Sequence, residues 1–180
     1  MEIQTDRLLL SSFMPTDAQA LFEGLQQYKE VLIRDFPITY SQTGTLEATQ
    51  QYLKDKAEVW QERKGLWLGI FLSTPQKVLI GSLLLRDLSW RVPKGELAYY
   101  LFPPYQKKGY AREALRAFSD WCFEEQGIRR LCMRIATHNT PSYRLAEACG
   151  FEKEGCLRKE HRTGEGDLVD VFVYARIMED

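Results

Sequence analysis

Residues 99–115 read YYLFPPYQKKGYAREAL. The stretch begins with aromatic and aliphatic residues, stops at two adjacent prolines, and continues with a glycine and small residues that open a helical pattern. Such a run is typical of a strand that leads through a short turn into a helix. The first four N–H groups of a helix have no partner within it, and the helix dipole makes that end positive. The sequence therefore predicts an anion-binding junction between a strand and a helix.

The turn itself has residue types that suit a pyrophosphate. Gly109 and Ala111 have little or no side chain, so a ligand can approach the backbone closely, while Lys107 and Lys108 add positive charge. The spacing fits neither the Gly-x-x-x-x-Gly-Lys-Ser/Thr of a P-loop nor the Gly-x-Gly-x-x-Gly of a dinucleotide fold. Taken alone, an ordinary turn that starts a helix explains these residues equally well.

Composition places the chain among ordinary globular proteins. Its 180 residues are 44% hydrophobic and 27% charged, with a formal net charge of -1, and this length predicts a single domain over residues 1–180. Without a strong basic field, nucleic acid is a poor candidate partner. The chain has no apolar run near the roughly 20 residues that span a bilayer, and its first residues lack a signal-peptide pattern. We therefore expect a cytoplasmic protein without membrane contact.

Cysteine and histidine spacing predicts no metal site. The four cysteines are far apart and form no Cys-x-x-Cys pair, and the chain has only two histidines. A zinc site needs such ligands at close, regular spacing. We expect no metal, and we expect the cysteines to be reduced packing residues.

Hydrophobic periodicity predicts the element order β-α-α-β-β-β-α-β-α-β-β. The clearest helix follows the junction, because apolar residues from Ala111 to Cys122 recur at helical spacing. Residues 29–43 have no clean period and are expected to be a loop, with or without a helical turn, that forms either one wall of an acceptor site or a packed connector. The order predicts an α/β protein with a mixed (α+β) sheet of about seven mostly antiparallel strands and about four helices. The predicted strands lie at residues 7–13, 66–72, 78–87, 96–102, 130–137, 151–161 and 168–177.

A second motif lies one predicted strand downstream of the junction and reads NTPSYRLAEACGF at residues 139–151. It resembles the pattern N-x-x-S/A-x-x-L-x-x-x-x-G-F of the GNAT superfamily of N-acetyltransferases. Residues 106–111 resemble the coenzyme A signature Q/R-x-x-G-x-G/A of the same superfamily. The opening TDRLLL at residues 5–10 and the segment EKEGCLR at residues 152–158 are similar to the ribosomal-protein N-terminal acetyltransferase (RimJ/RimL-like) branch. The resemblance covers nearly the whole chain.

The resemblance implies a GNAT fold that binds acetyl-coenzyme A where the sheet splays between its fourth and fifth predicted strands, 96–102 and 130–137. A β-bulge is expected near residues 100–102. The pantetheine arm would pair with the strand backbone there, and the amides of residues 106–111 would hold the pyrophosphate. Asn139 and Ser142 would face the thioester end, and Arg144 either reaches the nucleotide end or is an exposed helix charge. The implied cofactor-binding residues are Tyr100, Leu101, Phe102, Gln106, Lys107, Lys108, Gly109, Tyr110, Ala111, Asn139, Ser142 and Arg144.

The implied reaction is direct attack of an amine on the acetyl thioester in a ternary complex, without an acetyl-enzyme. An α-amino group has a reference pKa of about 7.7 to 8.0 and a lysine about 10.4, so a base must take a proton. Glu96, at the start of a strand that borders the cleft, is the first candidate for this catalytic base. Asp35 and His138 are lesser candidates. A backbone N–H near Leu101 would stabilise the negative charge that develops on the thioester oxygen.

The leaving thiolate also needs a proton donor. Many GNAT enzymes use a tyrosine at the position that Ala146 occupies here, so this chain departs from their pattern. In the RimJ/RimL-like branch a serine at the position of Ser142 serves instead, which makes Ser142 the expected catalytic donor. Tyr143 and Tyr174 remain alternatives.

The sequence leaves the acceptor open. The resemblance favours the N-terminal α-amine of a protein, of the ribosomal-protein type. A small-molecule amine such as a polyamine, amino acid or antibiotic is the alternative, and a non-catalytic acyl-coenzyme A sensor is another. A homodimer also fits this family, and nothing in the sequence decides it. Two or three aromatic residues are expected to line the acceptor pocket, from among Phe36, Tyr40, Trp67, Trp90, Tyr99 and Tyr100.

Overall fold

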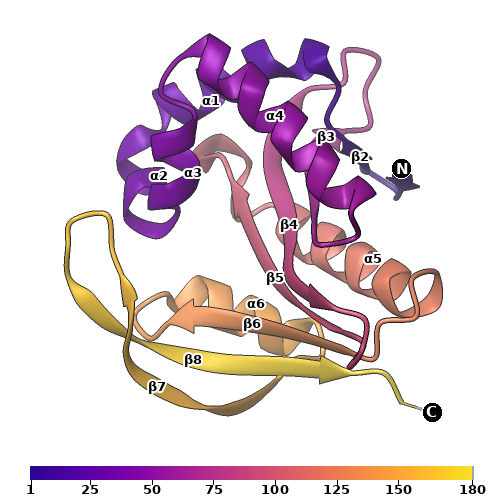
Figure 1. The fold of residues 1–180 in the computed structure, drawn as a ribbon, viewed down its shortest axis with the longest axis vertical. Coiled ribbons are helices and arrows are strands. Elements are labelled where there is room, and N and C mark those ends of the chain that lie inside the picture. The colour runs from indigo at the N-terminus through magenta and orange to yellow at the C-terminus, as the bar shows by residue number, and fades with distance from the viewer. Residues whose placement is uncertain (180) are drawn as a thin grey trace.

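One eight-stranded sheet with helices on both faces forms the core of the computed structural model, which describes residues 1–179 (Figure 1). The strands lie in the order β1-β2-β3-β4-β5-β6-β8-β7, and every neighbouring pair is antiparallel except β5 and β6. The predicted mixed, mostly antiparallel sheet is confirmed. The strands are β1 (Glu2–Gln4), β2 (Leu8–Ser12), β3 (Leu66–Leu72), β4 (Leu79–Ser89), β5 (Lys94–Leu101), β6 (Arg130–Ala136), β7 (Glu152–Arg162) and β8 (Leu168–Ile177).

The helices form two layers, with α1 to α4 over one face of the sheet and α5 and α6 over the other (Figure 1). Each layer has its own hydrophobic core. Phe118 of α5 is fully buried against Leu8 and Leu66 on one face, while Leu25 of α1 is buried near Phe71 on the other. The helices are α1 (Ala18–Gln27), α2 (Lys29–Asp35), α3 (Pro37–Gln42), α4 (Leu46–Gln61), α5 (Tyr110–Glu124) and α6 (Thr140–Ala148).

Two parts of the sequence prediction are wrong in detail. Residues 29–43 form the short helices α2 and α3 instead of a loop, separated at Phe36, with Pro37 in the first turn of α3. Helices of 7 and 6 residues are too short to repeat an apolar stripe, so they leave no periodic signal. Strand β1 was also not predicted, because three residues are too few for an alternating pattern to stand out from chance.

The hairpin of β7 and β8 reaches across to the helical layer and closes one side of the space beneath it. Gly164, at the hairpin tip, donates its N–H to the carbonyl oxygen of Arg34 in α2 at 3.3 Å. A Cβ atom at Gly164 would lie 2.2 Å from the carbonyl oxygen of Ile33, so only glycine allows this close approach. None of the helices within residues 1–179 is both long and apolar enough to cross a membrane.

Candidate active site

The junction between β5 and α5 presents a row of unused backbone donors. Gly109 caps α5 with a left-handed φ of +83°, and Lys107 also has a positive φ of +59°. Among residues 1–179, the amides from Lys107 to Ala111 meet no hydrogen-bond acceptor. The Gln106 side chain closes the loop by donating from Nε2 to the Leu101 carbonyl oxygen at 2.9 Å. The N–H of Gln106, which was also expected to hold the pyrophosphate, instead donates to the carbonyl oxygen of Pro103 at 3.2 Å. Consecutive free N–H groups at a helix start are the donors that an anion such as a pyrophosphate needs, and binding of coenzyme A here stays a prediction.

Arg7 adds a cation to this junction that sequence reasoning missed. Its guanidinium donates from Nη1 to the Lys108 carbonyl oxygen at 3.1 Å and lies 4.7 Å from the Tyr110 ring centroid. Glu113, in the first turn of α5, holds Arg7 through Nε at 2.7 Å and accepts from the Thr5 hydroxyl at 2.6 Å. Arg7 belongs to the opening motif at residues 5–10, so the motif was the available signal for this contact.

The sheet opens between β5 and β6, as expected. These parallel strands pair only at Lys94 with Arg130, Gly95 with Leu131 and Glu96 with Cys132. Beyond Cys132, β6 separates from β5 but stays paired with β8, as it is over its whole length. The N–H of Phe102 is committed to the carbonyl oxygen of Ile80 at 2.9 Å. Backbone groups alternate in direction along a strand, so those of Leu101 point to the opposite edge, toward the opening.

The expected bulge near residues 100–102 is wrong. Pairing of β4 with β5 is regular from Arg86 with Glu96 to Gly81 with Leu101, and the register shifts only between Arg86 and Ser89. The departure of β6 already frees one edge of β5, so no extra residue is needed there to release its backbone groups.

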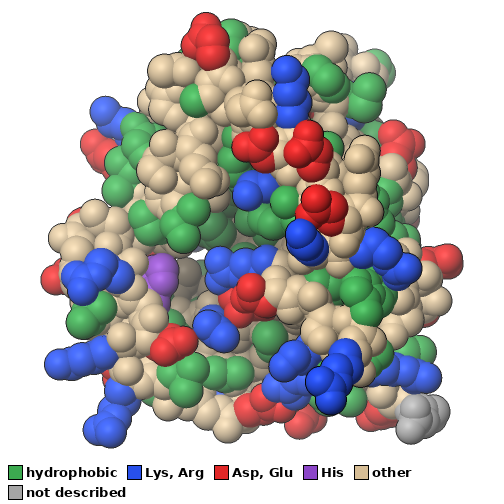
Figure 2. Space-filling model, in the orientation of Figure 1, with side chains coloured by type: hydrophobic (Ala, Val, Ile, Leu, Met, Phe, Trp, Pro, Cys, Tyr) green, Lys and Arg blue, Asp and Glu red, His purple; other side chains and the backbone are tan. Residues whose placement is uncertain are grey.

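A cavity of about 730 Å³ passes through this opening. Ala98 and Arg134 line it from the face that carries α1 to α4, whereas Tyr99 and Ser142 line it from the face that carries α5 and α6. Successive strand residues point to opposite faces, so lining by both neighbours means that the cavity crosses the sheet. Figure 2 shows a hollow on this side of the molecule, between the helices above and the sheet below, with Lys and Arg side chains beside it. Its outer wall comes from α2, α3, α4 and the β7–β8 hairpin.

Ser142 is held in the opening by α6 and by β5. The Asn139 side chain caps α6 by accepting the Ser142 N–H at 3.2 Å, and the Tyr99 hydroxyl donates to Ser142 Oγ at 3.3 Å. Burial raises the pKa of Tyr99, and its hydrogen bond to Ser142 lowers it in part. The tyrosine therefore stays a neutral donor behind the serine. Sequence reasoning placed Tyr99 among the acceptor aromatics and did not pair it with Ser142.

Glu96 lies at the last paired position before the opening and is 2% exposed. Its Oε1 accepts from Nε of Arg86 at 3.1 Å, and its Oε2 lies 3.2 Å from Nε of Arg134. Arg134 also contacts Oε1 of Glu160 through Nη1 at 3.2 Å. The four side chains form an alternating ionic row on the face that carries α1 to α4. Neither arginine partner was predicted, because they come from β4 and β6.

A model of the acetyltransferase (GNAT) domain matches residues 7–152. This chain belongs to the GNAT acetyltransferases. Over 176 residues this acetyltransferase is 28% identical to the uncharacterized N-acetyltransferase YoaA of Bacillus subtilis, which covers 96% of this chain and 94% of that protein. Because its relatives are named N-acetyltransferases, it is an enzyme of that class.

Two further proteins are similar to this chain, one in sequence and one in fold. The spermidine N(1)-acetyltransferase of Vibrio cholerae is 31% identical over 85 residues, which is 47% of this chain and 49% of that protein. The solved structure of RimL, a ribosomal L7/L12 α-N-protein acetyltransferase in complex with coenzyme A, superimposes with a TM-score of 0.90 at 23% identity. That match covers 99% of this chain and 98% of the other, and it shows the shared fold.

The other candidate residues of the acetyltransferase lie as follows. The Tyr174 hydroxyl donates to Oε1 of Glu147 at 2.8 Å, and Tyr143 packs edge-on against Phe172. Asp35 lines the cavity, where it pairs with Arg34 at 3.2 Å. His138 is exposed and does not line the cavity. Arg144 is exposed on α6, and its contact with a nucleotide stays a prediction.

Three of the six expected aromatics, Phe36, Trp67 and Tyr99, line the acetyltransferase cavity. Tyr100 is buried in the core, and Tyr40 and Trp90 do not reach the cavity. Among residues 1–179, no group of three His, Cys, Asp or Glu side chains is placed to hold a metal, and the absence of a metal stays a prediction. Sequence reasoning missed several polar lining residues, whose helix and hairpin positions look like ordinary solvated surface. These are Thr39, Tyr52, Lys56, Arg86, Arg134, Glu160, His161 and Arg162.

Proposed function

We propose that this enzyme transfers the acetyl group of acetyl-coenzyme A to the N-terminal α-amine of a protein or peptide, of the ribosomal-protein type. The observation that carries the proposal is the cavity through the sheet. The cavity connects the face with Ala98 and Arg134 to the face with Ser142. This second face also carries α5, which starts at the Gly109 junction. An amine can therefore enter from the face that carries α1 to α4 and meet a thioester that enters from the other. RimL, which has the same fold and was solved in complex with coenzyme A, supports the coenzyme A part of this proposal.

The cofactor site proposed for coenzyme A follows from the free donors. The amides from Lys107 to Ala111 bind the pyrophosphate, and Arg7 adds a charge beside them. The pantetheine arm lies along the free edge of β5 at Leu101, while Asn139 and Ser142 border its thioester end. Bound acetyl-coenzyme A supplies an activated acetyl group as a thioester.

Proton transfers are assigned to residues at the opening. Glu96 accepts the proton of the attacking amine, through a water molecule, at Oε2. Within residues 1–179, Arg86 donates twice to Oε1, whereas Oε2 has only the ionic contact with Arg134, which leaves a lone pair for the proton. The new C–N bond forms as the C–S bond breaks, and Ser142 gives its proton to the sulfur while Tyr99 replaces it. After the products leave, water that enters the cavity returns a proton to the Tyr99 oxygen and takes up the proton held by Glu96, so both groups return to their starting states. The N–H of Leu101 stabilises the developing oxyanion.

A panel of amines tests the proposed acceptor. The enzyme is incubated with acetyl-coenzyme A and three acceptors: a peptide with a free N-terminus, the same peptide N-terminally blocked with one free lysine, and spermidine. We expect acetylation of the free N-terminus, located by tandem mass spectrometry. Efficient turnover of spermidine at low concentration would instead support the small-molecule reading. Binding of acetyl-coenzyme A without turnover of any amine would support a sensor.

A further inference from the structure

A group of unpaired donors lies at the end of the cavity that is farthest from Ser142 along the sheet. Lys56 of α4 and Trp67 of β3 both line this end. The Lys56 ammonium lies over the rings of Tyr52 and Trp67, at 5.0 and 4.5 Å from their centroids. Among residues 1–179 it has no carboxylate within ion-pair distance. The indole Nε1 of Trp67 is buried and makes no hydrogen bond of normal geometry in that range, although it lies close enough to the Tyr52 hydroxyl to lower the pKa of that group.

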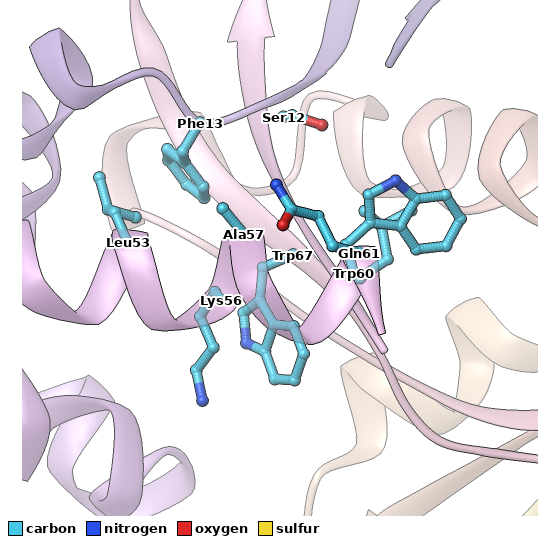
Figure 3. Close-up of a pocket in the computed structure, with 9 residues that line it drawn as sticks. Ser12, Phe13, Leu53, Lys56, Ala57, Trp60, Gln61 and Trp67 are labelled. Carbon is cyan, nitrogen blue, oxygen red and sulfur yellow. The ribbon is translucent and has the colours of Figure 1, made fainter. Parts of the chain in front are cut away.

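Both nitrogens point the same way. A smaller pocket of about 160 Å³ lies between α4 and β3, lined in part by Phe13, Leu53 and Trp60. Figure 3 shows the Lys56 side chain running away from Phe13, with the indole nitrogen of Trp67 on the ring edge nearest that side chain. The two donors are therefore directed away from the small pocket, toward the larger cavity that both residues also line.

Such an arrangement is costly without a ligand. A buried N–H without an acceptor loses the hydrogen bond that water would give it. Burial also lowers the pKa of Lys56, since the ammonium is partly removed from water. The acids that line the cavity do not relieve this, because Asp35 pairs with Arg34 and Glu160 with Arg134. An oxyanion placed between Lys56 and Trp67 would satisfy both donors at once.

We propose that Lys56 and Trp67 bind a carboxylate of the acceptor, so that the preferred substrate is a peptide N-terminus with an acidic group two to four residues into the chain. This inference rests on the proposed function. Trp67 pairs with Leu84 of β4, which pairs with Ala98 of β5, so two strand spacings of about 4.8 Å separate Trp67 from Ala98, which borders the opening where the amine enters, by roughly 10 Å. An extended peptide advances about 3.3 to 3.6 Å per residue. A peptide whose N-terminal amine lies at the opening would therefore place its third residue near Lys56 and Trp67.

The same distance excludes other acceptors. A free amino acid holds its carboxylate only two bonds from its amine, far too close to bridge roughly 10 Å. A polyamine has no oxyanion, and its second ammonium would meet the unpaired Lys56. The carboxylate can come from an acidic side chain or from the C-terminus of a tripeptide, and the experiment separates these sources.

The test compares acetylation of four peptides by the full-length enzyme at fixed acetyl-coenzyme A. Two hexapeptides differ only by Asp or Asn at position 3 and have amidated C-termini; two neutral tripeptides have a free or an amidated C-terminus. We expect a kcat/KM roughly 10- to 100-fold higher for the Asp hexapeptide than for its Asn partner, the range of one charge-assisted hydrogen bond. A higher value only for the free tripeptide would assign the site to a peptide C-terminus.

Variants tie this preference to the site. Lys56→Met keeps an unbranched apolar stem beside Trp67 and should reduce the Asp-to-Asn ratio to near one, while Lys54→Met, at an exposed position of the same helix, should leave it unchanged. Trp67→Phe provides a second variant should Lys56→Met fold poorly. Equal turnover of all four peptides by the wild type would overturn the carboxylate site but leave N-terminal acetylation intact. No turnover of any peptide would overturn both.

Discussion

The Tyr99 hydroxyl donates a hydrogen bond to Ser142 Oγ at 3.3 Å, although one residue lies on β5 and the other on α6, across the opening in the sheet. Burial raises the pKa of the phenol above its ordinary value of 10.0, despite the partial offset by Ser142. The phenol therefore keeps its proton throughout the neutral range. The pair can deliver a proton to a thiolate at the opening and needs no charged group to do so.

Replacing Ser142 should slow the chemical step without weakening binding. Ser142→Ala is expected to lower kcat by about 10²-fold or more, the usual range for a positioned acid, with little change in the KM for acetyl-coenzyme A. Tyr99→Phe should give a smaller loss, because the serine then lacks only its reprotonation partner. Tyr143→Phe tests the alternative donor next to Ser142; because its ring packs on Phe172, we expect this variant to retain kcat. Steady-state release of coenzyme A measures all three, and an unchanged kcat in Ser142→Ala would show that another group protonates the sulfur.

Glu96 and Glu160 both contact Arg134. Glu96 lies on β5 at the last position paired with β6, whereas Glu160 lines the cavity from β7. Glu96→Gln should lower kcat by about 10²- to 10⁴-fold near pH 7, and the defect should shrink as the pH rises toward the pKa of the acceptor amine. Glu160→Gln should retain kcat. If Glu96→Gln raises only the KM for the peptide, Glu96 anchors the two arginines and does not accept the proton.

Valine substitutions at Gly109 and at Gly127 form a matched test of the proposed coenzyme A site. Both glycines have left-handed φ values, +83° and +67°, so valine at either position should cost about 1 to 2 kcal/mol of stability. A Cβ on Gly109 points toward Nη2 of Arg7 at 3.2 Å, whereas a Cβ on Gly127 meets nothing within 4 Å. Calorimetric titration should show weakened acetyl-coenzyme A binding only in Gly109→Val. Equal affinities of the two variants for acetyl-coenzyme A would show that the junction at Gly109 is not part of the cofactor site.

Glu113 links the N-terminal strands to the same junction and should make the free energy of unfolding depend on pH. Burial raises the pKa of its carboxyl, but hydrogen bonds from Thr5 and Arg7 outweigh this and hold it below the ordinary value of 4.5. A native pKa below the unfolded value contributes stability that is present above pH 4.5 and is lost as the pH falls through the native pKa.

Urea unfolding of Glu113→Gln tests this linkage. The variant should be less stable than the wild type near pH 7, and the difference should narrow as the pH is lowered toward about 3. A difference that stays constant with pH would mean that Glu113 contributes through packing and not through its charge.

Local sequence pattern was sufficient to predict the strand, turn and helix around the Gly109 junction. The apolar stripe of α5, the prolines before it and the glycine at its start are close in sequence, so their geometry follows from spacing alone. The opening beside Glu96 followed from the family resemblance, and the pairing of β5 with β6 confirms it. The bulge that was expected near residue 101 is absent, because the departing neighbour strand already frees the same backbone groups.

Contacts set by sheet register were beyond sequence reasoning. Arg86 and Arg134 meet Glu96 only because β4 and β6 flank β5, and no local signal distinguishes them from surface arginines. Lys56 likewise occupies an ordinary helix position, and only the fold places it over Trp67. Arg86, Arg134 and Lys56 all line the cavity, and spacing along the chain predicts none of them.

Acetyl transfer through the opening is tested most directly by filling it at Ala98. With acetyl-coenzyme A at about 100 times its Kd, linkage of roughly 2.7 kcal/mol should raise the Tm by about 5 to 10 °C in both the wild type and Ala98→Trp. Ala98→Trp should nevertheless lose acetylation of the peptide, while Ala20→Trp, at an exposed position of α1, keeps it. Wild-type kcat/KM in an Ala98→Trp enzyme that still binds acetyl-coenzyme A would show that the acetyl group does not cross the sheet there.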